Sequence, residues 1–278
     1  MIEIKDLAFS YGSNEVLKNI NISLQEGKIY GLLGENGVGK TTLLTLLCGL
    51  KACKQGSIII DGQNPYKRTP SLLSNIYYLS DEVAPMNMTA IQYAKNFGKF
   101  WTRFDLSIFS EIMGILETDL QQKMNKMSFG QLKKTYIAFA LACQCKYLFM
   151  DEPTNGLDIP SKAQFRKAIM KYTSEDSTLL ISTHQVRDLE DIIDPIIILE
   201  TRDVLLNANL TDIATKLYFD YSGEPCTDAL YSEMTPAGSI QVRVNPDGRE
   251  SKVNIEALFN TAHLHPETIK GLFTPSEK

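Results

Sequence analysis

The sequence predicts an α/β fold: a mixed sheet with an antiparallel β subdomain, an inserted helical subdomain and a small C-terminal accessory unit. Apolar and polar residues alternate near the N-terminus, which is the pattern of a half-buried antiparallel sheet. Further along the chain, short apolar runs alternate with polar, helix-compatible stretches, and this favours a parallel sheet. Between these two regions, apolar residues recur with helical spacing.

Length and composition fit this organisation. The 278 residues suffice for one large domain, expected over 1–210 with its helical subdomain at about 85–140, and for a small accessory region over 211–278. Apolar residues make up 44% and charged residues 22%, as in ordinary soluble proteins. The net charge of -5 argues against a nucleic-acid partner held by a broad basic face.

Strands are expected where short apolar runs are bounded by turn residues. The continuously apolar run 29–33 suits a strand that is covered on both faces, and it leads into a glycine-rich loop and a helix over 42–50. The segment 221–238 has the composition of a loop, and a strand over 240–244 should follow it. Other strands are expected at 58–60, 76–79, 148–150, 179–181 and 196–199.

Neither membrane insertion nor disulfide bonding is expected. The N-terminus has no apolar targeting segment, and the longest apolar run falls well short of the roughly 20 residues that span a bilayer. The five cysteines are odd in number and lack paired metal-ligand spacing, so they are interpreted as reduced cytosolic thiols. Any membrane role must therefore come through a partner.

A phosphate-binding loop is predicted directly after the first buried strand. The residues from Gly34 to Thr41 read GENGVGKT and match the pattern G-x-x-x-x-G-K-[ST]. Glycines let backbone N–H groups turn toward phosphate oxygens, and the following helix adds its positive dipole end. The loop positions that we assign to nucleotide binding are Gly34, Asn36, Gly37, Gly39, Lys40, Thr41 and Thr42.

Lys40 should reach the β- and γ-phosphates, and the Thr41 hydroxyl should be a ligand of Mg²⁺. A second strand, at residues 147–150, ends in two carboxylates, Asp151 and Glu152. Asp151 is placed to hold Mg²⁺, and Glu152 to polarise the attacking water as a general base. Solvated surface acids after a strand are the alternative interpretation of this pair.

The surrounding residues identify a family. MSFGQ at 127–131 resembles the LSGGQ signature, and NGLD at 155–158 resembles the D-loop of ABC transporter ATPases. His184, after Ser182-Thr183, resembles their switch histidine, and Tyr11 resembles the aromatic residue that stacks on adenine. The sequence is therefore similar to ABC transporter ATP-binding subunits over about residues 1–210, with an ABC-type P-loop NTPase core.

This resemblance implies a head-to-tail pair of cassettes, either a homodimer or a heterodimer with a second ABC ATPase. Ser128, Gly130 and Gln131 would then contact the γ-phosphate of the ATP that the partner binds, and Asp158 would couple the two sites. His184 would sense the γ-phosphate, although a buried structural histidine is the alternative for such a residue. ATP and Mg²⁺ are the implied cofactors.

Two departures from the family pattern stand out. Phe129 occupies a signature position where the family usually has glycine, so its ring must either point away from a close backbone approach or tune the site. Asp81 or Glu82 stands where the Q-loop glutamine is usual, as in bacterial exporter-type ATPases. We expect Asp81 to fill the role of the glutamine as a partner of Mg²⁺ or water.

Two further features have competing interpretations. The pair His263 and His265 would share one face of a strand and could bind a metal, but a solvated turn before Pro266 is favoured. The aromatic residues between Phe97 and Phe104 could form a docking surface for a membrane partner, but the core of the helical subdomain is favoured.

The favoured function is ATP hydrolysis that powers a separately encoded membrane permease, as an exporter, from the cytoplasmic face of the membrane. The alternative is a soluble ABC ATPase that acts on DNA or ribosomes, but such relatives carry long coiled coils or two cassettes. A module that binds ATP without hydrolysing it is a third possibility, and the presence of Glu152 and His184 argues against it.

Overall fold

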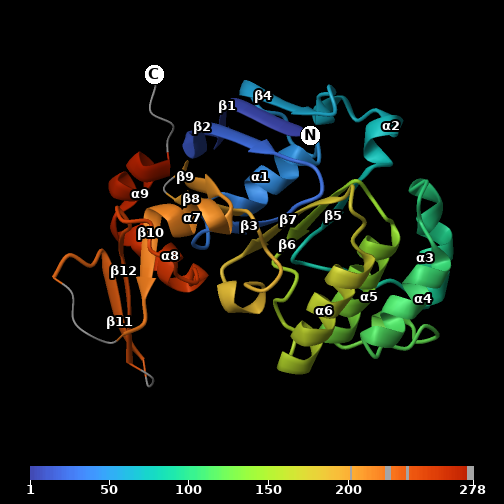
Figure 1. The fold of residues 1–278 in the computed structure, drawn as a ribbon. Coiled ribbons are helices and arrows are strands. Elements are labelled where there is room, and N and C mark those ends of the chain that lie inside the picture. The colour runs from blue at the N-terminus through green and yellow to red at the C-terminus, as the bar shows by residue number, and fades with distance from the viewer. Residues whose placement is uncertain (201, 223–226, 236–237, 274–278) are drawn as a thin grey trace.

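The computed structural model describes the whole chain except residues 201, 223–226, 236–237 and 274–278. Within the described residues, the strands form three sheets. Figure 1 shows a central sheet with a group of helices on one side and a C-terminal unit on the other. None of the helices described is both long and apolar enough to cross a membrane.

The central sheet has six strands in the order β5-β6-β7-β3-β8-β9. The first five are parallel to their neighbours, and β9 pairs antiparallel with β8, so the sheet is mixed as expected. The strand that the sequence did not predict is β9, which returns along β8 as the edge of the sheet. Its members are β3 (Ile29–Leu33), β5 (Ile76–Leu79), β6 (Tyr147–Asp151), β7 (Thr178–Thr183), β8 (Ile196–Glu200) and β9 (Asp203–Ala208).

The antiparallel sheet near the N-terminus is confirmed, with the order β2-β1-β4. Its strands are β1 (Ile2–Tyr11), β2 (Asn14–Leu24) and β4 (Gln55–Ile60). Alternate residues of β1 and β2 are buried and pack with helix α1 (Lys40–Leu47) in one hydrophobic cluster. This cluster fixes α1, and hence the loop before it, between the two sheets.

The inserted helical subdomain consists of α3 (Ala90–Phe97), α4 (Leu106–Ile115) and α5 (Phe129–Ala142), and α6 (Ile159–Tyr172) packs beside α5. Phe97, Trp101 and Phe104 pack against the core of this region, as the favoured interpretation had it. Phe100 differs, because its side chain is 62% exposed. The short helix α2 (Pro70–Leu73) and the 3₁₀ turns 65–67, 98–100, 124–126 and 186–188 complete this part of the fold.

The C-terminal unit has a small sheet of its own, in the order β10-β12-β11. The prediction of a loop over 221–238 was wrong in part, because residues 231–235 form β11 and pair with β12. A core of buried apolar residues in the unit continues into the core of the helical subdomain. Its elements are α7 (Leu210–Lys216), β10 (Leu217–Asp220), β11 (Tyr231–Thr235), β12 (Gly238–Val244), α8 (Ile255–Leu264) and α9 (Pro266–Phe273). The division near residue 210 into two units stays a prediction.

The histidine pair of the C-terminal unit does not lie on a strand. His263 is in α8, and His265 caps the end of that helix, so the two side chains do not share a strand face. His263 Nδ1 lies 3.2 Å from both carboxylate oxygens of Glu200. Of the five cysteines, four are described as free thiols, and Cys226 lies outside the described residues.

Candidate nucleotide-binding site

The glycine-rich loop connects the C-terminal end of β3 with the N-terminus of α1. Gly37 and Gly39 have φ angles of 84° and 114°, which are left-handed values that favour glycine. A Cβ atom on Gly39 would lie 2.8 Å from Leu17 Cδ2, so the neighbouring antiparallel sheet also requires glycine there. The loop is therefore held against β2 in a shape that turns backbone N–H groups inward.

Lys40 lies inside this loop and is 6% exposed. Its Nζ donates hydrogen bonds to the carbonyl oxygens of Gly34, at 2.6 Å, and Glu35, at 3.1 Å. Burial lowers the pKa of Lys40, whereas the nearby carboxylates of Glu152 and Asp151 oppose that change. The ammonium group is thus held at the centre of the loop by backbone oxygens and facing acids.

Asp151, the last residue of β6, is 3% exposed and accepts hydrogen bonds from two hydroxyls. Thr41 Oγ1 donates to Asp151 Oδ2 at 2.6 Å, and Ser182 Oγ donates to Asp151 Oδ1 at 2.5 Å. Ser182 was not singled out from the sequence as a site residue. It lies opposite Asp151 because β6 and β7 are paired in parallel and end at the same edge of the sheet, a register for which the sequence has no local signal.

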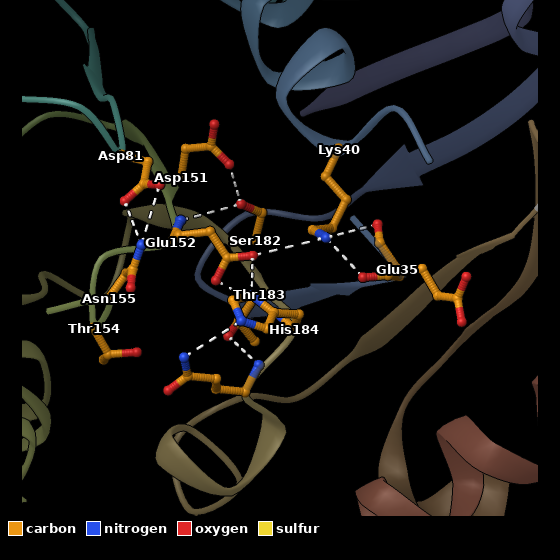
Figure 2. Close-up of polar contacts among 12 residues, drawn as sticks. Glu35, Lys40, Asp81, Asp151, Glu152, Thr154, Asn155, Ser182, Thr183 and His184 are labelled. Atoms are coloured by element: carbon orange, nitrogen blue, oxygen red, sulfur yellow. Dashed lines mark hydrogen bonds and ion pairs between the residues drawn. The ribbon is translucent and has the colours of Figure 1, made fainter. Parts of the chain in front are cut away.

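Glu152 lies between Lys40 and His184 (Figure 2). Its Oε1 is 2.9 Å from His184 Nδ1 and 3.7 Å from Lys40 Nζ. The backbone of Glu152 has φ 44°, an uncommon value for a residue with a side chain, and such strain is concentrated at functional sites. The structure therefore brings the three predicted catalytic side chains together at one point.

Tyr11 lies at the end of β1 and is 47% exposed. Its hydroxyl is 3.3 Å from Thr42 Oγ1, and Lys51 Nζ lies 4.8 Å from the ring centroid. One pocket of about 380 Å³ is lined by Tyr11, Asn36, Gly37, Gly39, Lys40, Thr41, Thr42, Asp81, Asp151 and Glu152. Gly34 is not among its lining residues, and its carbonyl oxygen accepts a hydrogen bond from Lys40. The pocket thus combines an aromatic ring, a buried ammonium group and carboxylates. The first two suit the base and the phosphates of a nucleotide, and the carboxylates suit a cation such as Mg²⁺.

The signature residues lie elsewhere on the same protomer. Ser128 caps helix α5, where its hydroxyl accepts from the backbone N–H of Gln131 at 3.2 Å. The helix begins at Phe129, directly after this cap. Among the described residues that line the pocket, Ser128, Gly130, Gln131 and Asp158 are absent. Their expected contact with nucleotide stays a prediction.

Phe129 and Asp158 both have defined local contacts. A Cβ atom added to Gly156 would lie 2.4 Å from Phe129 Cε1, so the phenylalanine ring lies against the D-loop glycine. Asp158 caps α6, because its Oδ1 accepts from the N–H of Ser161 at 3.0 Å. The ring of Phe129 is thus directed to the D-loop, and half of the residue stays exposed.

Of the two acids at the Q-loop position, Asp81 lines the pocket and Glu82 is exposed outside it. The Asp81 carboxylate also has protein partners. Lys133 Nζ donates to Asp81 Oδ1 at 3.1 Å, and Asn155 Nδ2 lies 3.2 Å from the same oxygen. The role of Asp81 as a metal or water partner stays a prediction.

Comparison with known proteins agrees with this site. The family model described as ABC transporter matches residues 17–155. A lantibiotic transport ATP-binding protein, SrtF of Streptococcus pyogenes, is 30% identical over 207 residues, which cover 70% of this chain and 84% of the relative. The bacitracin transport ATP-binding protein BcrA of Bacillus licheniformis is 32% identical over 198 residues, covering 70% of this chain and 65% of the relative.

Solved structures share the fold. The ATP-binding subunit of an ABC transporter has a TM-score of 0.68 and 22% identity, with coverage of 77% of this chain and 91% of that one. A dimeric ATP-binding cassette in a post-hydrolysis state has a TM-score of 0.67 and 22% identity, with coverage of 76% and 99%. The resemblance found in the sequence is confirmed, and the chain belongs to the ABC transporter family as one of its ATP-binding, ATP-hydrolysing subunits.

Proposed function

We propose that this protein hydrolyses Mg-ATP between two paired cassettes and thereby drives a separate permease that exports its substrate. The observation that supports the chemistry best is the contact of Glu152 with both Lys40 and His184 at the strand ends. Export is favoured because the similar proteins SrtF and BcrA bear the names of lantibiotic and bacitracin transport proteins.

The residues present fit a magnesium ion. Thr41 and Asp151 offer oxygen ligands already joined by a hydrogen bond of 2.6 Å, and Mg²⁺ prefers oxygen ligands. Asp81, which lines the same pocket, is the third proposed partner, directly or through water. When bound, the ion would neutralise charge on the phosphate oxygens. The Ser182 hydroxyl donates a hydrogen bond to Asp151 Oδ1 and so orients this carboxylate.

Each side chain of the pocket then has a separate role in binding or hydrolysis. Tyr11 stacks on adenine, and the loop N–H groups and Lys40 hold the phosphates. Glu152 takes the proton of the attacking water as general base, and His184 Nδ1, 2.9 Å away, fixes the direction of that carboxylate. Positioning and charge neutralisation are the main requirements of phosphoryl transfer.

The second cassette completes the site in this proposal. Ser128, Gly130 and Gln131 stand at the N-terminus of a 14-residue helix, where backbone N–H groups and the helix dipole favour phosphate. They would contact the ATP held by the partner, and Asp158 would couple the two sites. The partner is either another copy of this chain or a sister ATPase, and ATP-driven dimerisation of the purified protein distinguishes these cases.

The chemical roles are tested by Glu152→Gln. We expect turnover to fall at least about 100-fold, because general bases typically contribute 10²–10⁴-fold, while ATP binding is preserved and the dimer is trapped. Glu82→Gln is the matched control, since Glu82 is exposed and outside the pocket. Hydrolysis by Glu152→Gln at the wild-type rate would show that the assigned role is wrong.

The role of Asp81 has its own test. In Asp81→Ala, the proposal expects the Mg²⁺ concentration for half-maximal ATPase activity to rise, because one oxygen partner is lost. An unchanged Mg²⁺ dependence would remove Asp81 from the metal site and leave the other assignments standing.

A groove lined largely by apolar side chains is the proposed docking site for the permease. It measures about 410 Å³ and lies where the end of α1, α2 and the turn at 98–100 meet. Leu50 and Phe100 are 54% and 62% exposed beside it. A short cytoplasmic segment of the permease with apolar side chains would cover them, and this contact would place the protein on the cytoplasmic face of the membrane.

Co-purification tests the docking site. Tagged Glu152→Gln protein, expressed in its native host, should recover a polytopic membrane protein from detergent-solubilised membranes with Mg-ATP. Adding Phe100→Asp should abolish this recovery, whereas Met234→Asp should not, because Met234 is an exposed apolar residue of the C-terminal unit. Recovery from cytosol alone, with ribosomes or DNA-bound proteins, would overturn the transporter proposal and favour the soluble alternative; no nucleic-acid partner is expected.

A further inference from the structure

Helix α5 contains a buried lysine that the mechanism above does not use. The Lys133 side chain is 0% exposed. Its Nζ donates to the Asp81 carbonyl oxygen at 2.7 Å and to Asp81 Oδ1 at 3.1 Å, and it lies 3.5 Å from the Ser80 carbonyl. A buried ammonium group is costly unless it is paired and hydrogen-bonded, so Asp81 supplies the charge that makes this lysine tolerable.

The same carboxylate reaches the D-loop. Asn155 Nδ2 lies 3.2 Å from Asp81 Oδ1 and 3.3 Å from Asp81 Oδ2, so its amide donates toward the two carboxylate oxygens (Figure 2). Lys133 and Asn155 are thus connected through Asp81. The three residues come from three segments: the Q-loop after β5, helix α5 and the loop after β6.

A second contact ties the D-loop to the start of α5. The ring of Phe129 lies against Gly156, one residue after Asn155. Both departures from the family pattern, Asp81 and Phe129, therefore meet the D-loop at adjacent residues. This coincidence argues that they belong to one arrangement and are not two separate tolerated changes.

We propose that Lys133 is a positioning residue that, through Asp81, holds the D-loop in place for pairing with the second cassette. This inference rests on the proposed function, because the D-loop is expected to couple the two ATP sites there. Asp81 then connects helix α5 to Asn155 through its hydrogen bonds with Lys133 and with the Asn155 amide. The positive charge of Lys133 also offsets the negative charge that Asp81 brings to the phosphate pocket.

A thermal double-mutant cycle tests the connection without nucleotide. Lys133→Met and Asn155→Ala do not remove groups that touch each other, and both groups hydrogen-bond to the Asp81 carboxylate. If Lys133 positions the D-loop, the falls in Tm, about 5 °C or more for Lys133→Met, will be clearly non-additive. Additive falls would reduce Lys133 to a core residue and overturn the proposal.

Dimer formation supplies the functional measurement. In the Glu152→Gln background, we expect Lys133→Met and Asn155→Ala each to raise the ATP concentration for half-maximal dimerisation about tenfold, equivalent to 1.4 kcal/mol. Lys95→Met is the matched control, because its side chain is exposed on helix α3 of the same subdomain and should leave dimerisation unchanged.

The outcomes separate the inference from the proposed function. Dimerisation of both variants at the ATP concentration of the parent would overturn the positioning role. A Glu152→Gln parent that binds ATP but never dimerises would count against the proposed paired cassettes, and the thermal cycle would still decide whether Lys133 controls the D-loop. Should Lys133→Met not fold, Lys133→Gln, which keeps a hydrogen-bond donor but no charge, takes its place in the same cycle with Asn155→Ala and in the same dimer assay.

Discussion

The nucleotide pocket and the C-terminal unit are built on opposite principles. In the pocket, buried polar groups meet at the ends of parallel strands, and Lys40, Asp151 and Glu152 are all less than 9% exposed. In the C-terminal unit, buried apolar residues such as Phe219, Val242 and Leu258 connect the unit to the rest of the molecule. The first region should therefore govern activity and the second stability, and four variants test that division.

The largest expected effect is on nucleotide binding by Lys40→Ala. Loss of the ammonium group should weaken ATP affinity at least about 100-fold, because hydrogen bonds between charged groups are worth roughly 1.5–3 kcal/mol each. Titration with a fluorescent ATP analogue measures the affinity, and Lys54→Ala, at an exposed position, is the control. Tight binding by Lys40→Ala would contradict the assignment of the loop.

The next effect is on stability, through Leu258→Ala in α8. Leu258 is 0% exposed, and truncation of a buried leucine costs about 2–5 kcal/mol. Denaturant unfolding should show this loss, whereas ATP turnover of the folded fraction should stay within about twofold of wild type. Leu264→Ala, on the same helix but 58% exposed, should cost little. If Leu258→Ala instead lowered turnover with stability intact, the division between the regions would fail.

A smaller effect is expected where the two regions touch. Arg187 Nε donates to Glu256 Oε2 at 2.5 Å, joining the segment after His184 to α8. Because both side chains are substantially exposed, Glu256→Gln should change the free energy of unfolding by less than about 1 kcal/mol. ATPase kinetics provide the sharper measurement: a change of more than twofold would mean that the C-terminal unit acts on the switch histidine.

The smallest effect concerns acid sensitivity of the C-terminal unit. Hydrogen bonds from Ser222, and then the charge of Arg243 at 2.6 Å, lower the pKa of Asp220. A carboxyl with a lowered folded-state pKa stabilises the protein above its unfolded pKa of about 3.9 and loses this contribution as pH falls through the folded value. Asp220→Asn should therefore lose less stability than the wild type on acidification below about pH 4, because the contribution of this one carboxylate is already absent. Identical acid-unfolding profiles for the variant and the wild type would remove Asp220 from this role.

The sequence predicted groups that are close along the chain far better than groups brought together by folding. Lys40 and Thr41 were predicted from a strand, a glycine loop and a helix that follow one another, and Asp151 and Glu152 from the end of a strand. In both cases one short segment carries the whole motif. The bond from Ser182 to Asp151 and the contact from Lys133 to Asp81 join segments 31 and 52 residues apart, and their register has no local signal.

The misses in secondary structure have similar causes. Residues 231–235 have the mixed polarity of an edge strand that is partly solvated, so nothing distinguished β11 from the polar loop before it. Helix α5 begins at Phe129 because Ser128 and Gln131 form reciprocal capping bonds. Glycine at position 130 argues for a loop by propensity, and the capping bonds together with the packing of α5 override it.

The left-handed backbone of Glu152 also bears on the balance between stability and activity at this position. A φ of 44° is easily adopted by glycine but not by a residue with a Cβ atom, so glycine would relax the chain at this point. Glycine would also remove the carboxylate that faces His184. In the proposed mechanism, glycine would remove the general base together with the backbone strain, so stability and activity make opposite demands on this position.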